Sequence, residues 1–379
     1  MPRHPSVAPR VAALQGGVFS RLAHRIAALE GEIYPLHVGD TWMEPMRGAR
    51  MEDLRVDALP GLHRYTRPMG HPRLVAAASR RWDVAPERIL VSAGATGGLS
   101  AAAGALLALD DEVLILAPYW PLIPGIVSTR GGRPVAVPYY DRPGSVAERL
   151  APYLTERTVA LYLNTPSNPT GRVLPAAELA ELAAFARAHG LWVWSDEVYE
   201  DYVYEGEHVP MRHLAPERTL TALSFSKAWG MAGNRCGVLL GPEDAAVMQQ
   251  IRKQSIHSFY AASTSSQLAA AAALESDFSW VRHARDQYRA AGRSAAAALG
   301  LPAPEGGTFL FVDVAAQLPT PDADGLHAFC VACLEGNLIV APGSSCGPTY
   351  GDHIRLCFTS APPDVVARGV TVLAELLGR

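Results

Sequence analysis

The stretch Val159-Ala-Leu-Tyr-Leu-Asn-Thr-Pro-Ser-Asn-Pro-Thr-Gly171 joins a short apolar run to a turn with two asparagines and two prolines within six residues. The run Val159–Leu163 has the length and composition of a strand that is covered on both faces. The prolines restrict the backbone that follows, and the asparagine amides project from it. Local hydrogen bonding by asparagine explains a turn, but it does not explain why this turn follows a sheet strand.

Similar apolar runs recur through the first two thirds of the chain and alternate with alanine-rich stretches of helical periodicity. This alternation predicts a mostly parallel α/β sheet. The expected strands are Ile89–Ser92, Val113–Ala117, Val135–Val137, Val159–Leu163, Leu191–Ser195, Thr221–Ser224 and Gly237–Leu240. The expected helices between them are Leu99–Leu109, Ser145–Tyr153 and Ala176–His189. Ligands of open α/β sheets bind beyond the carboxyl ends of the strands, where Asn164, Asp196 and Ser224–Lys227 fall.

The last third of the chain has a different pattern, which predicts a second, α+β unit. Its long helix could bridge the two units, because no linker separates them. The expected helices are Ser279–Leu299, Gly325–Leu334 and Pro363–Leu377, and the expected strands are Thr308–Asp313, Leu338–Ala341 and Ile354–Phe358.

The composition is that of a globular protein, with 49% apolar and 18% charged residues. A net charge of −4 without a basic block argues against non-specific binding to nucleic acid or anionic membranes. No apolar stretch approaches the ~20 residues of a membrane helix, and the N-terminal residues contain no signal-peptide core. We therefore expect a cytoplasmic protein.

Five scattered cysteines do not form the pattern of a disulfide framework. Cys330 and Cys333 have the spacing of a redox or zinc motif, but no second pair is nearby. We therefore expect Cys330 and Cys333 to be two small core residues on one helix. The twelve histidines are also scattered, without an HExxH motif, so no metal site is expected.

Lys227 directly follows an apolar strand and lies among small residues, in Ser224-Phe-Ser-Lys227. Desolvation would lower the pKa of its amine and make it a nucleophile toward carbonyl groups. Taken by itself, Lys227 would be interpreted as a surface lysine at the junction of a strand and a loop. Ser224 before it and Arg235 after it supply a hydroxyl and a guanidinium that can hold a phosphate.

Three further strand ends carry candidate side chains. Ser92-Ala-Gly-Ala-Thr-Gly-Gly98 opens a helix, so its amides and the Thr96 hydroxyl can donate to an anion. Asp196 could pair with a pyridinium nitrogen, or cap the next segment, and Tyr199 follows it closely. Trp120 could stack on a planar ring.

Arg355 lies inside the apolar run Ile354–Phe358. A buried arginine needs an anionic partner, because an unpaired buried charge is very costly. The partner is either a structural Asp or Glu or the carboxylate of a substrate.

Together these segments resemble the class I/II aminotransferase family of fold-type I pyridoxal 5′-phosphate (PLP) enzymes, from about Leu36 to the C-terminus. The segments that carry this resemblance are Asn164–Gly171, Asp196-Glu-Val-Tyr199 and Ser224-Phe-Ser-Lys227 with Arg235. It implies an α/β fold with a large domain at residues 41–280 and a small domain at 281–379. Residues 1–40 would form an N-terminal arm and part of the small domain.

The resemblance also implies a role for each candidate residue. Lys227 would form the Schiff base with PLP and move the substrate proton, Asp196 would pair with the pyridine nitrogen, and Arg355 would bind the substrate α-carboxylate. Asn168 and Tyr199 would bond the ring's phenolic oxygen, and Trp120 would stack on the ring. The phosphate would be held by Gly94, Ala95, Thr96, Ser224 and Arg235. Gly39 would lie at the substrate site, and Tyr65 would reach the phosphate of a neighbouring subunit in a homodimer.

Three segments depart from the family pattern. The family often has Gly-Glu-Pro-Asp-Phe where this chain has Gly39-Asp-Thr-Trp42, and Lys or a polar residue at Thr96. It often has Pro-Gly-Ser-Ala-Phe-Gly where this chain has Pro342-Gly-Ser-Ser-Cys-Gly347. The first and third segments lie near the substrate entrance in that family, so the substrates stay open.

The implied reaction is a ping-pong transfer of an amino group from an L-amino acid to a 2-oxo acid. The same cofactor chemistry also serves β-elimination at C–S bonds and biosynthetic cyclisation, which remain alternatives. A PLP-binding regulator on the same fold would need a DNA-binding domain, for which the 35 residues before Leu36 are too few. An inactive relative would not be expected to retain Lys227, Asp196 and Arg235.

Overall fold

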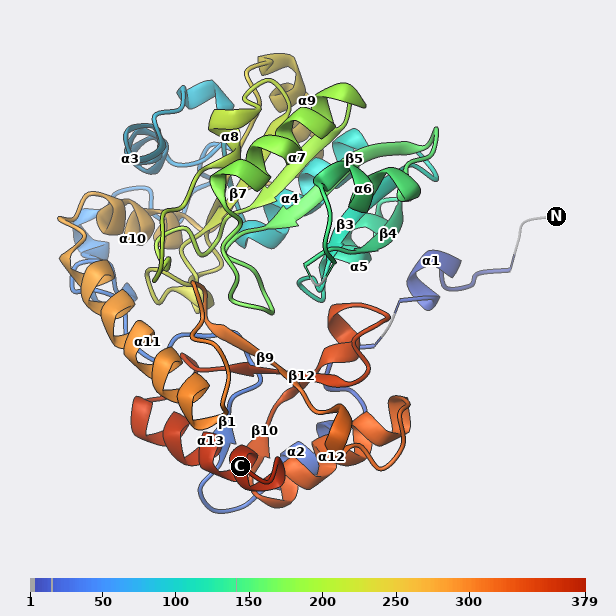
Figure 1. Ribbon diagram of the computed structural model, residues 1–379. Coiled ribbons are helices and arrows are strands. Elements are labelled where there is room, and N and C mark those ends of the chain that lie inside the picture. Colours follow the sequence, from blue (N-terminus) through green and yellow to red (C-terminus); the bar gives the residue numbers. More distant parts are fainter. Residues whose placement is uncertain (1–3, 15, 141) are drawn as a thin grey trace.

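The computed structural model describes residues 4–14, 16–140 and 142–379 and divides them into two parts (Figure 1). A large sheet with helices on both faces forms the upper part of the view, and a smaller α+β unit lies beneath it. The predicted fold class is therefore confirmed. The exact domain limits at residues 40 and 280 remain a prediction.

The large sheet has seven strands within the described residues, in the order β2-β8-β7-β6-β5-β3-β4. All seven predicted strands are present, and every pairing is parallel except those of β8, which is antiparallel to β2 and β7. Their bounds are β2 Ile89–Ser92, β3 Glu112–Ala117, β4 Arg133–Pro138, β5 Thr158–Asn164, β6 Trp192–Asp196, β7 Thr219–Ser224 and β8 Gly237–Leu240.

Helices cover both faces of this sheet, which explains why its strands are apolar throughout. Along β5, Ala160 and Tyr162 pack into one core cluster, and Leu161 and Leu163 pack into the other. One face is covered by α4 (Gly94–Leu106), α5 (Ile123–Thr129) and α9 (Ala245–Ile256). The other is covered by α6 (Val146–Leu150), α7 (Ala176–Ala188) and α8 (Met211–Leu214).

Helix α4 differs from its predicted range, Leu99–Leu109. It begins at Gly94 and ends at Leu106. The glycine-rich segment before Leu99, which was expected to open a helix, forms the first turn of α4, and the chain enters it through Gly94 at φ +70°. A left-handed entry of this kind favours glycine, so the turn-like composition and the helix start coincide.

The smaller unit contains a three-stranded antiparallel sheet, β11-β12-β9, and helices around it. The strands are β9 Phe309–Asp313, β11 Ala341–Pro342 and β12 His353–Cys357, and the helices are α11 Ser279–Ala298, α12 Ala323–Glu335 and α13 Pro363–Leu376. Near the N-terminus, β1 (Tyr34–Pro35) pairs with β10 (Leu338–Ile339), so residues far apart in sequence meet here. The predicted single strand Leu338–Ala341 is wrong, because β10 and β11 pair with different partners.

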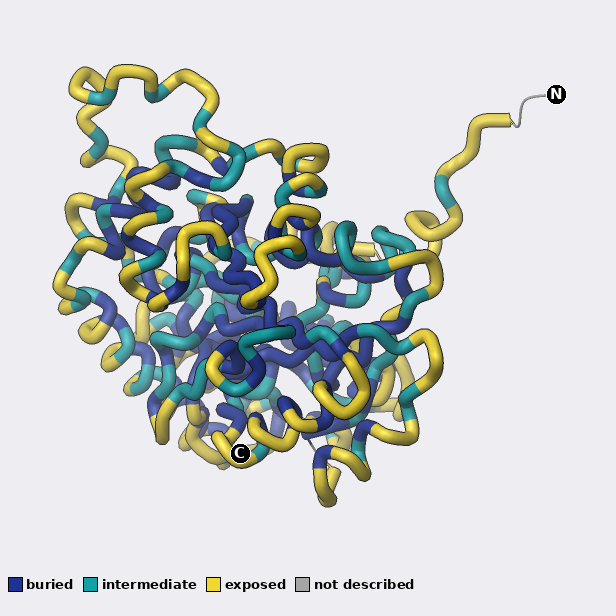
Figure 2. Tube along the Cα trace, turned by 90° about the horizontal axis from the view of Figure 1, so that it is seen from above, coloured by how far each residue is buried: buried dark blue, intermediate teal, exposed yellow. Residues whose placement is uncertain are grey.

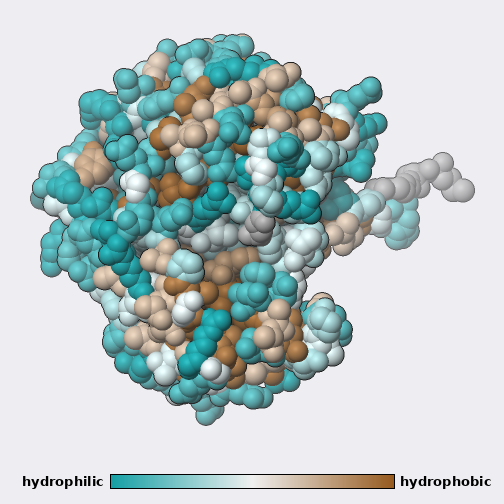
Figure 3. All heavy atoms as spheres, viewed as in Figure 1, coloured by the Kyte–Doolittle hydropathy of each residue, from teal (hydrophilic) through white to brown (hydrophobic). Residues whose placement is uncertain are grey.

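The remaining helices are α1 Pro9–Ala12, α2 Ala23–Ala27, α3 Pro72–Trp82 and α10 Thr264–Leu274. Figure 1 shows α11 running beside both parts of the molecule, as expected for a bridging helix. Seen from above, the buried residues lie together inside the molecule, and the segment at the N-terminus is exposed (Figure 2). The space-filling view shows a hollow between the two parts (Figure 3).

All five cysteines are buried free thiols, and Cys330 and Cys333 lie in the core face of α12. Burial raises the pKa of Cys330 to about 12, so this thiol is a core side chain, as expected. Among the described helices, none combines the length and hydropathy that a membrane span requires.

Candidate active site

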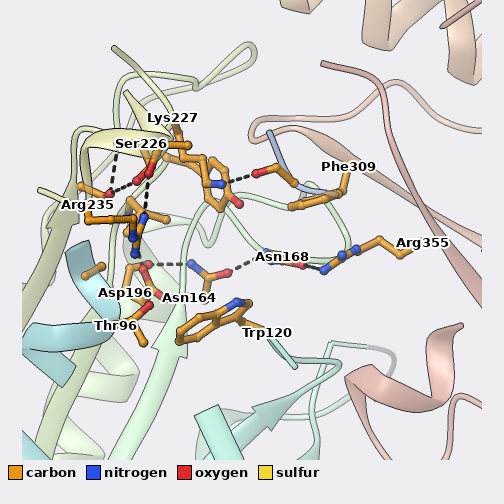
Figure 4. Close-up of a pocket in the computed structure, with 16 residues that line it drawn as sticks. Thr96, Trp120, Asn164, Asn168, Asp196, Ser226, Lys227, Arg235, Phe309 and Arg355 are labelled. Carbon is orange, nitrogen blue, oxygen red and sulfur yellow. Dashed lines mark hydrogen bonds between the residues drawn. The ribbon is translucent and has the colours of Figure 1, made fainter. Parts of the chain in front are cut away.

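A pocket lies at the carboxyl ends of β5, β6 and β7, where residues of the smaller unit also line it (Figure 4). The pocket encloses about 190 Å³. Its lining residues come from both parts of the chain: Gly39, Ala95, Thr96, Trp120, Asn164, Asn168, Asp196, Val198, Tyr199, Ser224, Ser226, Lys227, Ala232, Arg235, Phe309 and Arg355.

One end of the pocket is built to hold an anion. The first turn of α4 has no side-chain cap, so its amides are open to a ligand beside Thr96. Arg235 lies over this turn, and a Cβ added to Gly94 would come within 2.5 Å of its Nη2. Among the described residues, Arg235 forms no ion pair and bonds only the Ala232 carbonyl, at 2.9 Å. The arrangement fits a phosphate group.

Two serine hydroxyls complete this end. The hydroxyl of Ser224 donates to that of Ser226 at 2.9 Å, and the Ser226 amide donates to the Ser224 oxygen at 3.1 Å. Both side chains line the pocket, as Arg235 does, and Figure 4 shows Ser226 at the same end as Arg235.

Asp196 supplies an acidic group from the last position of β6. Its Oδ2 accepts a hydrogen bond from the Tyr162 hydroxyl at 2.8 Å, and its Oδ1 accepts from the Val198 amide at 3.4 Å. Burial raises the pKa of Asp196 to about 6, although the Tyr162 bond acts in the opposite direction. A buried carboxylate of this kind gains from a cationic partner in the pocket.

Lys227 projects into the pocket just beyond β7, and its Nζ donates to the backbone carbonyl of Gly39 (Figure 4). Burial lowers the pKa of Lys227, and no described carboxylate forms an ion pair with it. A lowered pKa increases the fraction of neutral amine, which is the form that attacks carbonyl groups.

Arg355 lies at the other end of the pocket and is 7% exposed. Its Nη1 donates to Asn168 Oδ1 and its Nη2 to the His37 carbonyl, both at 3.0 Å, while Nε is buried without a partner. Burial and the nearby Arg355 charge lower the pKa of His37 to about 4, so this imidazole is neutral near pH 7. Of the two partners expected for Arg355, no structural carboxylate is found among the described residues. The other expected partner of Arg355 is the carboxylate of a ligand.

The walls of the pocket are aromatic and apolar. Trp120 lies across the pocket from Lys227 in Figure 4. Phe309 packs its edge against Tyr199, with ring centroids 6.2 Å apart, and the Arg355 guanidinium lies 4.4 Å from its centroid. A Cβ on Gly39 would come within 2.5 Å of Phe309 Cζ, so this close approach requires glycine.

Two predicted residues lie outside the lining. Gly94 is behind it, under Arg235. Tyr65 is 89% exposed and packs against Tyr260, with ring centroids 5.1 Å apart. The sequence analysis did not include Val198, Ala232 or Phe309, and it noted Asn164 and Ser226 only as residues at strand ends. The Ser-Phe-Ser alternation after β7 could have identified Ser226, but the position of Phe309 depends on the packing of the two units.

Behind Asp196 lies a buried polar network that sequence reasoning also missed. Glu197 accepts hydrogen bonds from the Ser195 hydroxyl at 2.7 Å and the Met211 amide at 3.0 Å, and its Oε2 is 2.9 Å from His208 Nε2. Glu197, Glu200 and His208 each offer one atom that could bind a metal ion, and these three atoms lie within 4.8 Å of one another. Protein partners already hold them, however, since Trp82 donates to Glu200 at 2.6 Å.

Comparisons with known proteins agree with this geometry. The sequence model of the family described as aminotransferase class I and II matches residues 34–373. The chain is 33% identical over 335 residues to the aspartate/prephenate aminotransferase of Thermus thermophilus, covering 84% of each chain. It is 34% identical over 307 residues to an arginine–pyruvate transaminase of Pseudomonas aeruginosa, covering 77% of this chain and 76% of the relative.

Solved structures give the same result. The aspartate aminotransferase of Thermus thermophilus with maleate superimposes with a TM-score of 0.88 at 28% identity, covering 98% of this chain and 100% of that one. The chain belongs to the aminotransferase class I and II family. It is an aminotransferase, an enzyme that moves an amino group between an amino acid and a 2-oxo acid.

Proposed function

We propose that the pocket binds PLP through Lys227 and transfers the amino group of an L-amino acid to a 2-oxo acid there. The observation that carries this proposal is the charge arrangement of the pocket. Three cations, Lys227, Arg235 and Arg355, form no ion pairs among the described residues, and one buried carboxylate, Asp196, lines the same pocket. PLP and an amino acid together carry the complementary groups: a phosphate, an aldehyde, a pyridine nitrogen and an α-carboxylate.

Each end of PLP has matching residues. Gly94, Ala95 and Thr96 would hold the phosphate with their amides, together with Ser224 and Arg235. Asp196 would keep the pyridine nitrogen protonated, Trp120 would stack on the ring, and Asn168 and Tyr199 would bond its phenolic oxygen. Bound there, PLP supplies an electron sink for the negative charge that develops at the substrate Cα.

The chain's own residues then position the substrate and move a proton. Arg355 would bind the α-carboxylate through its guanidinium and fix the Cα near Lys227. Lys227 Nζ, in its neutral form, would take the Cα proton as a general base. The close contact of Gly39 with Phe309 would shape the substrate side of the pocket.

A homodimer with shared active sites is the proposed assembly. Tyr65 is exposed outside its own pocket, and the apolar side chains of Met51, Val56 and Tyr260 are also exposed. A second copy that covered this surface would bury them, and Tyr65 would then reach the partner's phosphate site. A cytoplasmic location is proposed as well, since the five cysteines are free thiols, as in reducing compartments.

The test of the proposed function is to reduce the PLP-loaded protein with borohydride and map the modified peptide. The expected result is PLP fixed to Lys227 in the wild type and no fixation in Lys227→Ala. Lys253→Ala, which changes an exposed helix lysine, is the matched control and should remain labelled. A label on another lysine in the wild type would overturn the proposal. A panel of amino donors with 2-oxoglutarate or pyruvate then identifies the substrates, and ammonia release without an acceptor would indicate elimination instead.

A further inference from the structure

Tyr162 is a fully buried tyrosine in the middle of β5, and its hydroxyl contacts the acidic group of the pocket from behind. It does not line the pocket itself. The apolar pattern of Val159–Leu163 gives this residue a core position, and its ring does pack in the core with Trp194. Its hydroxyl, however, donates to Asp196 Oδ2 at 2.8 Å.

The register of the sheet explains why this contact forms. β5 and β6 are parallel, with Tyr162 beside Trp194 and Asn164 beside Asp196. Residues two apart on a strand share a face, so Tyr162 and Asp196 are diagonal neighbours on one side of the sheet. A phenol is long enough to span that diagonal, whereas an aliphatic side chain would leave Oδ2 without this donor.

From this geometry we infer that Tyr162 is a positioning residue that acts through Asp196 on the pyridine nitrogen of the cofactor. The hydroxyl fixes the rotation of the carboxylate and favours its ionised form. The only other hydrogen bond to this carboxylate among the described residues is the long one from Val198, at 3.4 Å. The ionised form is the one that keeps a proton on a facing ring nitrogen. This inference rests on the proposed function.

Tyr162→Phe removes the hydroxyl and keeps the ring in the core. Tyr204→Phe is the matched control, because Tyr204 is also buried and donates to a backbone carbonyl, that of Gly307, at 2.7 Å. The first measurement is the Kd of PLP for the cofactor-free proteins. The second is the ¹⁵N chemical shift of the pyridine nitrogen of ¹⁵N-labelled PLP in the loaded proteins, at fixed pH.

For Tyr162→Phe we expect the Kd to rise about tenfold, the effect of losing one hydrogen bond to a charged group. The nitrogen shift should move toward that of unprotonated pyridine, and kcat should fall while KM for the amino donor stays within about twofold, because Arg355 is untouched. Tyr204→Phe should match the wild type in all four quantities. A purely structural role would lower the unfolding midpoint of both variants and leave the nitrogen shift alone.

A wild-type nitrogen shift in Tyr162→Phe overturns the inference. If that variant does not fold, 3-fluorotyrosine at position 162 replaces it. A fluorinated phenol is a stronger donor, so the nitrogen shift should move further toward the protonated value, and an unchanged shift overturns the inference. Failure of the proposed function looks different, because the wild type itself would then not carry PLP on Lys227.

Discussion

Arg355 Nη1 donates to Asn168 Oδ1 at 3.0 Å, and this bond joins the two parts of the molecule. Arg355 lies on β12 of the smaller unit, and Asn168 lies in the turn that follows β5 of the large sheet. The backbone N–H of Asn168 in turn donates to Asn164 Oδ1 at 2.6 Å. The side-chain Nδ2 of Asn164 donates to the backbone carbonyl of Asp196 at 2.7 Å. One row of hydrogen bonds thus links the proposed substrate end of the pocket to its proposed cofactor end.

Arg355→Ala should raise KM for the amino donor about 100-fold, which corresponds to losing two charge-assisted hydrogen bonds of about 1.5 kcal/mol each. The absorbance of bound PLP should not change, since Arg355 does not belong to the phosphate or ring sites. Steady-state kinetics and absorbance spectra check both points. Arg368→Ala, which breaks a surface ion pair with Glu32, is the control and should change neither. An unchanged KM in Arg355→Ala would remove this residue from carboxylate binding.

Gly94→Ala should weaken PLP binding by about tenfold or more, because the new methyl group displaces Arg235 from the phosphate site. The substitution also introduces left-handed strain, since Gly94 has φ +70°. Gly206→Ala controls for that strain, because Gly206 has φ +74° with nothing within 4 Å of the added Cβ. Titration of the cofactor-free proteins with PLP gives both Kd values. Equal effects of the two substitutions would show that backbone strain alone is responsible.

Asp196→Asn should stabilise the cofactor-free protein at pH 8 while it weakens PLP binding. The folded-state pKa of about 6 lies above the ordinary value of 3.8. Its stabilising contribution is therefore present below about pH 4 and lost as the pH rises through 6. Asparagine does not ionise, so the variant should gain roughly 1–3 kcal/mol at pH 8 and close to nothing at pH 4.

Urea unfolding of the cofactor-free proteins at pH 4, 6 and 8 measures this difference. Asp286→Asn, at an exposed carboxylate, is the control and should show no such pH dependence. A loss of stability at pH 8 in Asp196→Asn would contradict the prediction.

His208→Gln should remove part of the decrease in unfolding free energy that the wild type shows as the pH rises above about 6.5. Burial, the largest single effect, lowers the pKa of His208, but the hydrogen bond to Glu197 and the charges of Glu197 and Glu200 together raise the net pKa. For Glu197, burial raises the pKa, and the bond to His208 leads the effects that make the net pKa lower. The histidine contribution is present below about pH 6.5 and lost as the pH rises through the folded-state pKa.

The wild type should therefore lose stability from pH 6.5 upward more steeply than His208→Gln. The variant should be less stable by about 1–3 kcal/mol at pH 6, the cost of a lost hydrogen bond to a charged group. Thermal or urea unfolding across pH 6–9 tests this. His213→Gln, a more exposed histidine of the next helix, provides the comparison. Parallel curves for the wild type and His208→Gln would contradict the prediction.

Much of the fold was predictable because its strands are apolar on both faces, and that pattern marked all seven strands of the large sheet. Polar residues at strand ends, such as Asp196 and Lys227, stood out for the same reason. Phe309 did not stand out, because its place in the pocket depends on how the two units pack together. The apolar residues around Tyr162 in the sequence predict a core position for it. The contact of its hydroxyl with Asp196 depends on the register between β5 and β6, which the sequence does not reveal.

The row from Asp196 through Asn164 and Asn168 to Arg355 also has a consequence for cooperativity. A substrate carboxylate that drew Arg355 away from Asn168 would leave Asn168 Oδ1 without this donor. The backbone N–H of Asn168 would still donate to Asn164 Oδ1. We expect occupation of the proposed carboxylate end to be linked thermodynamically to the proposed ring end, in both directions. Analogues without an α-carboxylate should therefore leave PLP affinity unchanged, whereas dicarboxylates and monocarboxylates that engage Arg355 should alter it.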